Sequence, residues 1–87
     1  MNKDKQKSLI NFLDSITQNP LDYKYETVLD NIIVYVYSLQ DFHTVLGWCG
    51  SWGAYFTFST VEQPDDTHKV EYQIEITDYD KDLSKYV

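Results

Sequence analysis

The stretch Val70–Thr77, VEYQIEIT, alternates apolar and polar residues without a break. Successive side chains of a β-strand point to opposite faces of the sheet. The apolar face holds Val70, Tyr72, Ile74 and Ile76, and the polar face holds Glu71, Gln73, Glu75 and Thr77. This pattern predicts a strand with one face buried in a core and the other face in water.

An N-terminal helix is the element that we expect to cover the apolar face of this strand. Leu9, Phe12, Leu13 and Ile16 follow the spacing of a helical apolar stripe, with charged residues between them. Asn19-Pro20 ends the helix, because the residue before a proline avoids the α region. We expect the helix over residues 4–18.

Two further strands precede the middle of the chain. Ile32–Tyr37, IIVYVY, is β-branched and aromatic throughout and predicts a strand. Tyr23–Leu29 also alternates, and Asp30-Asn31 between the two segments suits a two-residue hairpin turn. An alternative interpretation makes residues 21–29 a short helix.

Residues 38–59 carry mixed signals. Ser38 followed by Asp41 resembles a capping box and predicts one or two helical turns. We expect the three glycines that follow to break any helix, and Trp52–Ser59 to form a third strand because aromatic residues alternate there. The glycines are Gly47, Gly50 and Gly53.

These elements predict an α+β fold: one N-terminal amphipathic helix packed on an antiparallel sheet of about four strands. We expect a single small domain over residues 1–87. Gln63–Asp66 has turn chemistry, and the charged tail from Asp78 to Val87 is expected to fray.

Composition excludes several classes of protein. The chain has 87 residues, one cysteine, no arginine and a net charge of −7. A single cysteine rules out an internal disulfide framework, and no apolar run approaches the ~18 residues of a membrane span. The acidic balance argues against direct contact with nucleic acid or an anionic membrane, since phosphates are bound by Lys and Arg. With no signal-peptide pattern, we expect a cytoplasmic protein.

The residues that could carry catalysis or bind a metal form weak patterns. Asp41, His43 and Cys49 lie close in sequence, but a cysteine beside Trp48 is more typical of packing. Zinc-ligand spacings are missing, and Asp78–Asp82 begins like a calcium loop but has Leu83 where that loop requires glycine. We therefore expect no catalytic residue, no metal and no cofactor.

Acidic residues are concentrated in the last third of the chain. Eight acids and two lysines between Glu62 and Asp82 give this stretch a net charge of −6. The acids are Glu62, Asp65, Asp66, Glu71, Glu75, Asp78, Asp80 and Asp82. An ordered acidic stripe presents carboxylates as a nucleic acid presents phosphates, and it attracts a basic groove. The same acids also suit a second interpretation, in which they keep a small protein soluble.

The fourteen aromatic residues are more than a small core can enclose. Exposed Tyr and Trp are preferred anchors of protein interfaces, so we expect Trp48, Trp52 and Tyr79 to contact a partner. For the two tryptophans, a packed core is the alternative. The tyrosines expected at the surface are Tyr23, Tyr25, Tyr35, Tyr37, Tyr55 and Tyr79, whereas Tyr72 is expected to face the core.

The function that these features favour is a small acidic inhibitor that docks on a basic surface of a nuclease or another nucleic-acid-binding protein complex. Phage-encoded anti-CRISPR and anti-restriction proteins, including DNA mimics, are similar in size and charge. One alternative is an immunity protein that neutralises a nuclease toxin. An alternative of another class is a homodimeric structural or adaptor module that extends its sheet through Ile32–Tyr37.

Overall fold

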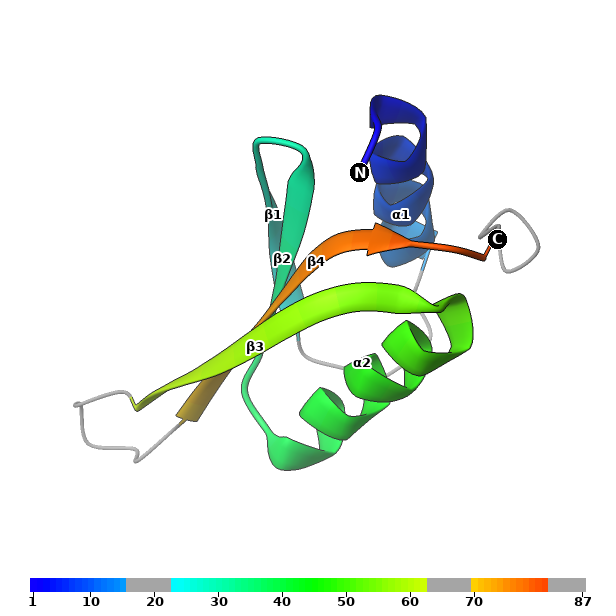
Figure 1. Ribbon diagram of the computed structural model, residues 1–87. Helices are drawn as coiled ribbons and strands as arrows, with labels where there is room; N and C mark the ends of the chain where they lie inside the picture. The colour runs from blue at the N-terminus through cyan, green and yellow to red at the C-terminus, as the bar shows by residue number, and fades with distance from the viewer. Residues whose placement is uncertain (16–22, 63–69, 82–87) are drawn as a thin grey trace.

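The computed structural model describes residues 1–15, 23–62 and 70–81. Its elements are α1 (Lys3–Ser15), β1 (Tyr23–Val28), β2 (Asn31–Val36), α2 (Leu39–Trp52), β3 (Ala54–Glu62) and β4 (Val70–Tyr79). The strands form one sheet in the order β1-β2-β4-β3, and every neighbouring pair is antiparallel (Figure 1). The predicted α+β fold is confirmed, with a second helix added.

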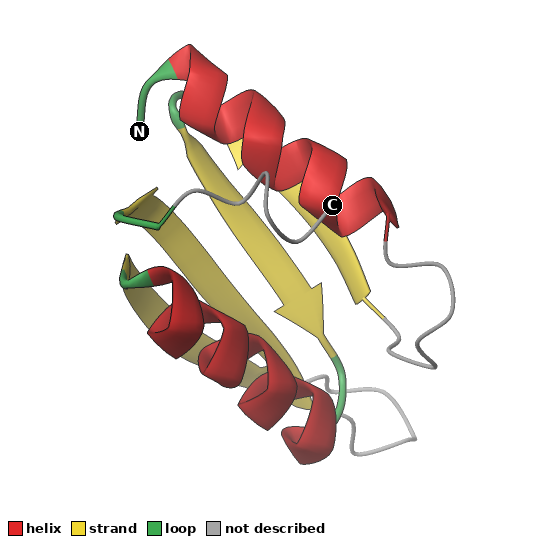
Figure 2. Cartoon of the chain, turned by 90° about the vertical axis from the view of Figure 1, so that its right-hand side faces the viewer, coloured by secondary structure: helices red, strands yellow, loops and turns green. Residues whose placement is uncertain are grey.

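Both helices lie on the same face of the sheet (Figure 2). The buried residues of the core between the two layers come from α1, β2, α2 and β4, and β1 and β3 add partly buried side chains that pack against them. The buried residues are Leu9, Leu13, Ile32, Val34, Val36, Phe42, Val45, Cys49, Trp52, Ile74, Ile76 and Tyr79. The apolar alternation predicted for Val70–Thr77 is confirmed, because Ile74 and Ile76 are fully buried on this side.

Helix α1 begins close to its predicted start. The side chain of Asn2 accepts a hydrogen bond from the Lys5 N–H at 2.8 Å, which satisfies one of the free donors of the first turn. Leu9 and Leu13 are the buried positions of the helix. The predicted stop at Asn19-Pro20 lies outside the described residues.

The hairpin of β1 and β2 is confirmed, and the alternative helix over residues 21–29 is wrong. Its turn is one residue earlier than predicted: Val28 pairs with Asn31, so Leu29 and Asp30 form the loop. Leu29 adopts a left-handed conformation with φ of 55°. Asn31 belongs to β2, where its side-chain amide donates to Glu75 of the neighbouring β4 at 2.9 Å.

The length of α2 is the largest departure from the sequence-based prediction. The helix has 14 residues, and Gly47 and Gly50 lie inside it. Ser38 caps its start by accepting from the Asp41 N–H, as predicted, and Gly53 ends it with φ of 65°. The free energy gained by burying the apolar stripe of α2 exceeds the ~1 kcal/mol that each interior glycine costs. Trp52 therefore ends a helix and does not begin β3.

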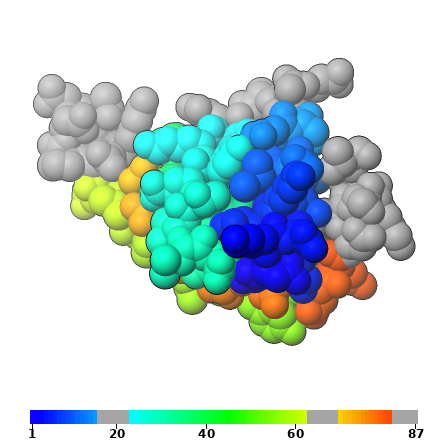
Figure 3. All heavy atoms as spheres, turned by 90° about the horizontal axis from the view of Figure 1, so that it is seen from above, coloured from blue at the N-terminus to red at the C-terminus, as the bar shows by residue number. Residues whose placement is uncertain are grey.

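The chain remains ordered beyond the point where we expected the tail to fray. Strand β4 continues to Tyr79, whose side chain is 2% exposed and whose hydroxyl donates to the Lys5 carbonyl oxygen at 2.7 Å. At the N-terminus, Gln6 bonds the Leu29 carbonyl oxygen at 3.1 Å, so α1 and the hairpin lie side by side at the surface (Figure 3). Residues 63–66, predicted as a turn, and residues 82–87 lie outside the described part.

Candidate functional site: the open face of the sheet

The helices leave one face of the sheet uncovered by the described residues (Figure 2). Ile33 on β2 stands opposite Glu26 on β1 and Glu75 on β4. We call this side the open face; it carries Lys24, Glu26, Ile33, Tyr35, Thr57, Ser59, Val61, Glu71, Gln73 and Glu75. The predicted polar face of Val70–Thr77 therefore does face outward, and side chains from the other three strands enlarge it.

Three carboxylates on the open face accept hydrogen bonds from uncharged donors. The Tyr35 hydroxyl donates to Glu26, and this bond raises the pKa of Tyr35 to about 12. The Gln73 amide donates to Glu71 at 3.2 Å. The Asn31 amide donates to Glu75 at 2.9 Å. Each carboxylate is therefore oriented by a neighbouring side chain, and a carboxylate that accepts one hydrogen bond has lone pairs for further donors.

Among the described residues, the Lys24 ammonium also lies on this face. The pKa of Lys24 is raised, mainly by a hydrogen bond with Tyr37 and in smaller part by the charges of Glu71 and Glu26. The Lys24 ammonium lies over the Tyr35 ring, 5.3 Å from its centroid. This side chain therefore occupies the β1 end of the face, away from β3.

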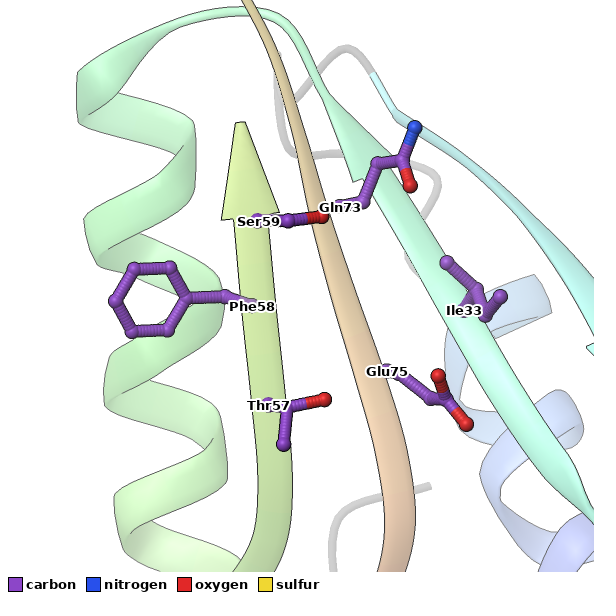
Figure 4. A pocket seen from close by; sticks show the side chains of 6 residues that line it. All are labelled: Ile33, Thr57, Phe58, Ser59, Gln73 and Glu75. Carbon is purple, nitrogen blue, oxygen red and sulfur yellow. The ribbon is translucent and has the colours of Figure 1, made fainter. Parts of the chain in front are cut away.

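A shallow hollow lies on the open face between β2 and β3. It encloses about 290 Å³ of space that is open to solvent, and it is lined by Ile33, Thr57, Phe58, Ser59, Gln73 and Glu75. Thr57 and Ser59 point toward β4, whereas the Phe58 ring points away toward α2 (Figure 4). The hollow thus combines an aliphatic side chain, Ile33, with hydroxyl, amide and carboxylate groups.

Of the eight acids predicted as one stripe, the five that the structure describes do not all lie together. Glu71 and Glu75 share the open face, but Glu62 lies at the far end of β3, opposite Val70. At the other end of β4, Asp78 is paired with Lys5 at 3.0 Å, and Asp80 accepts a hydrogen bond from Tyr55 at 3.2 Å. Asp65, Asp66 and Asp82 lie outside the described residues.

Glu26 is the member of the site that the sequence reasoning missed. Tyr23 and Tyr25 pair with the buried Val36 and Val34, so Lys24 and Glu26 between them point to the open face. The alternation of β1 was visible in the sequence. What could not be read from it was that β4 pairs with the other side of β2, which places Glu26 in the same row of the sheet as Glu75.

The predicted aromatic anchors lie in or against the core. Trp52 and Tyr79 are each 2% exposed, so the prediction that they stand at the surface is wrong. Trp48 is partly buried, and Phe12 of α1 meets both tryptophans edge to face, with ring centroids 5.5 and 5.1 Å apart. Because α2 continues to its fourteenth residue, Trp52 falls on the same helical stripe as Cys49. The packed-core alternative is confirmed for Trp52.

Most of the other tyrosines are only partly exposed. Tyr55 is 56% exposed, as predicted, whereas Tyr23, Tyr25, Tyr35 and Tyr37 are half-buried. Tyr23 and Tyr25 donate to groups at the end of α1, namely the Leu13 carbonyl oxygen and the Asp14 carboxylate. These rings therefore attach β1 to the helix layer.

Cys49 and His43 lie on different sides of α2. Cys49 is fully buried, and this burial raises the pKa of its thiol to about 12, whereas His43 is exposed. The thiolate that a nucleophile or metal ligand requires is therefore disfavoured near neutral pH. Within residues 1–15, 23–62 and 70–81, no three His, Cys, Asp or Glu side chains are grouped to hold a metal ion.

Comparison of this chain with protein-family models, with curated proteins and with solved structures finds no match. Across the described part of the chain, neither helix has the length and apolar character needed to cross a membrane.

Proposed function

We propose that this protein is a small inhibitor whose open face binds a basic surface of a nucleic-acid-handling protein. The observation that carries this proposal is the set of three carboxylates, Glu26, Glu71 and Glu75, which uncharged donors hold on an uncovered sheet face. Such carboxylates replace the phosphates that the basic surface binds in its natural ligand.

The sheet fixes the spacing of these charges. Glu71 and Glu75 are four residues apart on β4, which is ~13 Å along a strand. Glu26 and Glu75 are two strands apart in the same row, which is ~10 Å across the sheet. A partner therefore meets an array that is already ordered, and less conformational entropy is lost when the complex forms.

The hollow favours arginine as the partner residue that enters it. An arginine side chain has an aliphatic stem and a planar guanidinium that binds a carboxylate through two parallel hydrogen bonds. In the hollow, the stem would lie against Ile33, while the guanidinium would reach the free lone pairs of Glu75. The Gln73 amide oxygen offers a further acceptor.

Inhibition follows from occlusion. The net charge of −7 accelerates encounter with a positively charged surface, and the bound protein then covers the groups that nucleic acid needs. Both the rate and the affinity of such a complex fall as salt screens the charges. The single unpaired cysteine suits a reducing compartment, so we place this activity in the cytoplasm.

The first experiment is capture of the partner from lysate of the source cell, followed by elution with a salt gradient and mass spectrometry. The captured protein is then purified, and its release of bound nucleic acid is titrated with wild type and with a Glu71→Gln/Glu75→Gln variant. We expect the variant to bind about tenfold more weakly or worse.

The matched control is Asp4→Asn/Asp41→Asn, which changes the net charge by the same amount in the first turns of α1 and α2, on the other side of the sheet. It is expected to bind like wild type. An equal loss of affinity for the partner in the two variants would contradict the proposal. Affinity that stays constant from about 50 to about 500 mM salt would also contradict it. If the captured partner is a nuclease toxin, the inhibitor is an immunity protein.

A further inference from the structure

The two edges of the sheet differ in length and in chemistry. β3 forms one edge and is nine residues long, and Ala54–Val61 within it contains no charged residue. β1 forms the other edge with six residues that include Lys24 and Glu26. Soluble proteins normally protect edge strands with charges, prolines, bulges or short length. By these criteria the β1 edge is protected, whereas the middle of the β3 edge, from Thr57 to Val61, is not.

Large apolar side chains are exposed along the β3 edge. Phe58 is 58% exposed, Tyr55 56% and Val61 41%. The irregularity in the ladder with β4 is confined to the start of the strand, at Tyr55/Phe56. In Figure 1, β3 lies nearest the viewer, and no helix or other strand of the described residues crosses in front of it. Its outer backbone groups are therefore placed to pair with a further strand.

We propose that this further strand is β3 of a second copy of the chain, paired antiparallel around a two-fold axis at Phe58. Phe58 is the midpoint of the strand, so this register matches all nine residues. Phe58 then faces Phe58, Tyr55 faces Val61, and Thr57 faces Ser59. Aromatic and β-branched pairs of this kind stabilise antiparallel strands. The dimer carries one continuous sheet of eight strands.

The charges on the strand agree with a second copy as the occupant. Glu62 is the one charged residue of β3, and in this register it faces Ala54. No carboxylate of β3 therefore opposes its own copy, although each chain carries −7 overall. The alternative in which a dimer extends its sheet through Ile32–Tyr37 is wrong, because β2 already pairs with β1 on one side and with β4 on the other.

The net charge gives this dimer a salt dependence opposite to that of the proposed complex with a basic partner. Two chains of −7 repel each other, so added salt strengthens the dimer, whereas salt weakens binding to a basic surface. A negative result for the dimer therefore does not count against the complex with a basic partner, and the reverse also holds. The Glu71→Gln/Glu75→Gln variant separates them further, since it weakens partner binding and leaves β3 intact.

Sedimentation equilibrium of the full chain across a concentration series tests the dimer. We expect the dissociation constant of the dimer to fall as salt rises from about 50 to about 500 mM. The decisive variants are Val61→Lys and Val28→Lys, because the two valines are 41% and 39% exposed on opposite edges of the sheet. Val61→Lys is expected to raise the dissociation constant of the dimer about fivefold or more, because Val61 faces Tyr55 twice in the symmetric dimer. Val28→Lys is expected to leave that constant unchanged.

A Phe58→Cys variant tests the register. The two introduced thiols face each other across the axis, whereas Cys49 is buried, so mild oxidation is expected to give a covalent dimer. Circular dichroism shows whether each variant folds, and Val28→Cys is the matched control for random collision. A chain that stays monomeric at high salt, equal effects of the two lysine variants, or equal cross-linking of the two cysteine variants would overturn the proposal.

Discussion

The Lys5 ammonium in α1 lies 3.0 Å from Oδ1 of Asp78 at the end of β4, and it also donates to the Tyr79 carbonyl oxygen at 2.7 Å. The Tyr79 hydroxyl returns a bond to the Lys5 carbonyl oxygen. These reciprocal contacts join the first helix to the last strand. They explain why the chain is ordered at Tyr79, where charge alone suggested a frayed tail.

The first prediction concerns the pH dependence of this link. The hydrogen bond from Lys5, and then that from the Tyr79 N–H, lower the pKa of Asp78 from its ordinary value of 3.8. A carboxyl whose pKa is lower in the folded state stabilises the fold above its unfolded pKa, and this stability is lost as pH falls through the folded pKa. Asp78→Asn is therefore expected to lower the free energy of unfolding at pH 7, and this difference is expected to shrink as pH falls below 3.8 and through the lowered pKa of the folded state.

Urea denaturation at several pH values measures this difference. Asp30→Asn is the control, because it removes the same charge from the exposed hairpin loop. A constant difference between wild type and Asp78→Asn from neutral to acid pH would show that the ion pair does not contribute.

The three glycines near α2 are predicted to respond to alanine with opposite signs. Gly47 and Gly50 are helical, and a methyl group at either would meet nothing within 4 Å. Alanine there is expected to raise the free energy of unfolding by about 0.5–1 kcal/mol. At Gly53, φ is 65° and the new methyl carbon would lie 3.3 Å from the Asp80 Cβ, so alanine is expected to cost about 1 kcal/mol or more. Thermal unfolding of the three variants checks the order.

Leu29 is predicted to be replaceable with a gain in stability. It is 92% exposed and holds φ at 55°, a conformation that costs a residue with a Cβ about 1 kcal/mol or more. Leu29→Gly removes this cost, while the greater freedom of the unfolded chain offsets part of the gain. We expect a net increase of about 0.5 kcal/mol in the free energy of unfolding, and Leu29→Asn should act in the same direction. A loss of stability in both variants would show that the loop uses the leucine side chain.

The Cys49 thiol is predicted to be unreactive in the folded protein. It is fully buried, and its pKa is raised to about 12 by that burial. A thiol reagent at pH 8 should therefore modify Cys49 only when the protein opens, and at full speed in denaturant. Stopped-flow absorbance measures both rates. Rapid modification without denaturant would place Cys49 at an accessible site.

The sequence by itself determined the elements whose hydrophobic period is strong. The alternation of Val70–Thr77, the β-branched run at Ile32–Tyr37 and the apolar stripe of the first helix all predicted their structures correctly. These patterns are local, because the period of the apolar residues directly reflects the geometry of a strand or a helix. The two-residue period of a strand also predicted that Glu71 and Glu75 of the candidate site share the exposed side of one strand.

Tertiary structure alone decided the features that depend on contacts between distant residues. Gly47 and Gly50 belong to a helix because Phe42, Val45, Cys49 and Trp52 gain more from burial than the glycines cost. Trp52 and Tyr79 are buried because α1 packs over them, and Glu26 joins Glu75 because β1 and β4 flank β2. Strand order decides which backbone edge is free, and no local pattern encodes it. In the folded chain β2 lies inside the sheet and β3 lies at its edge.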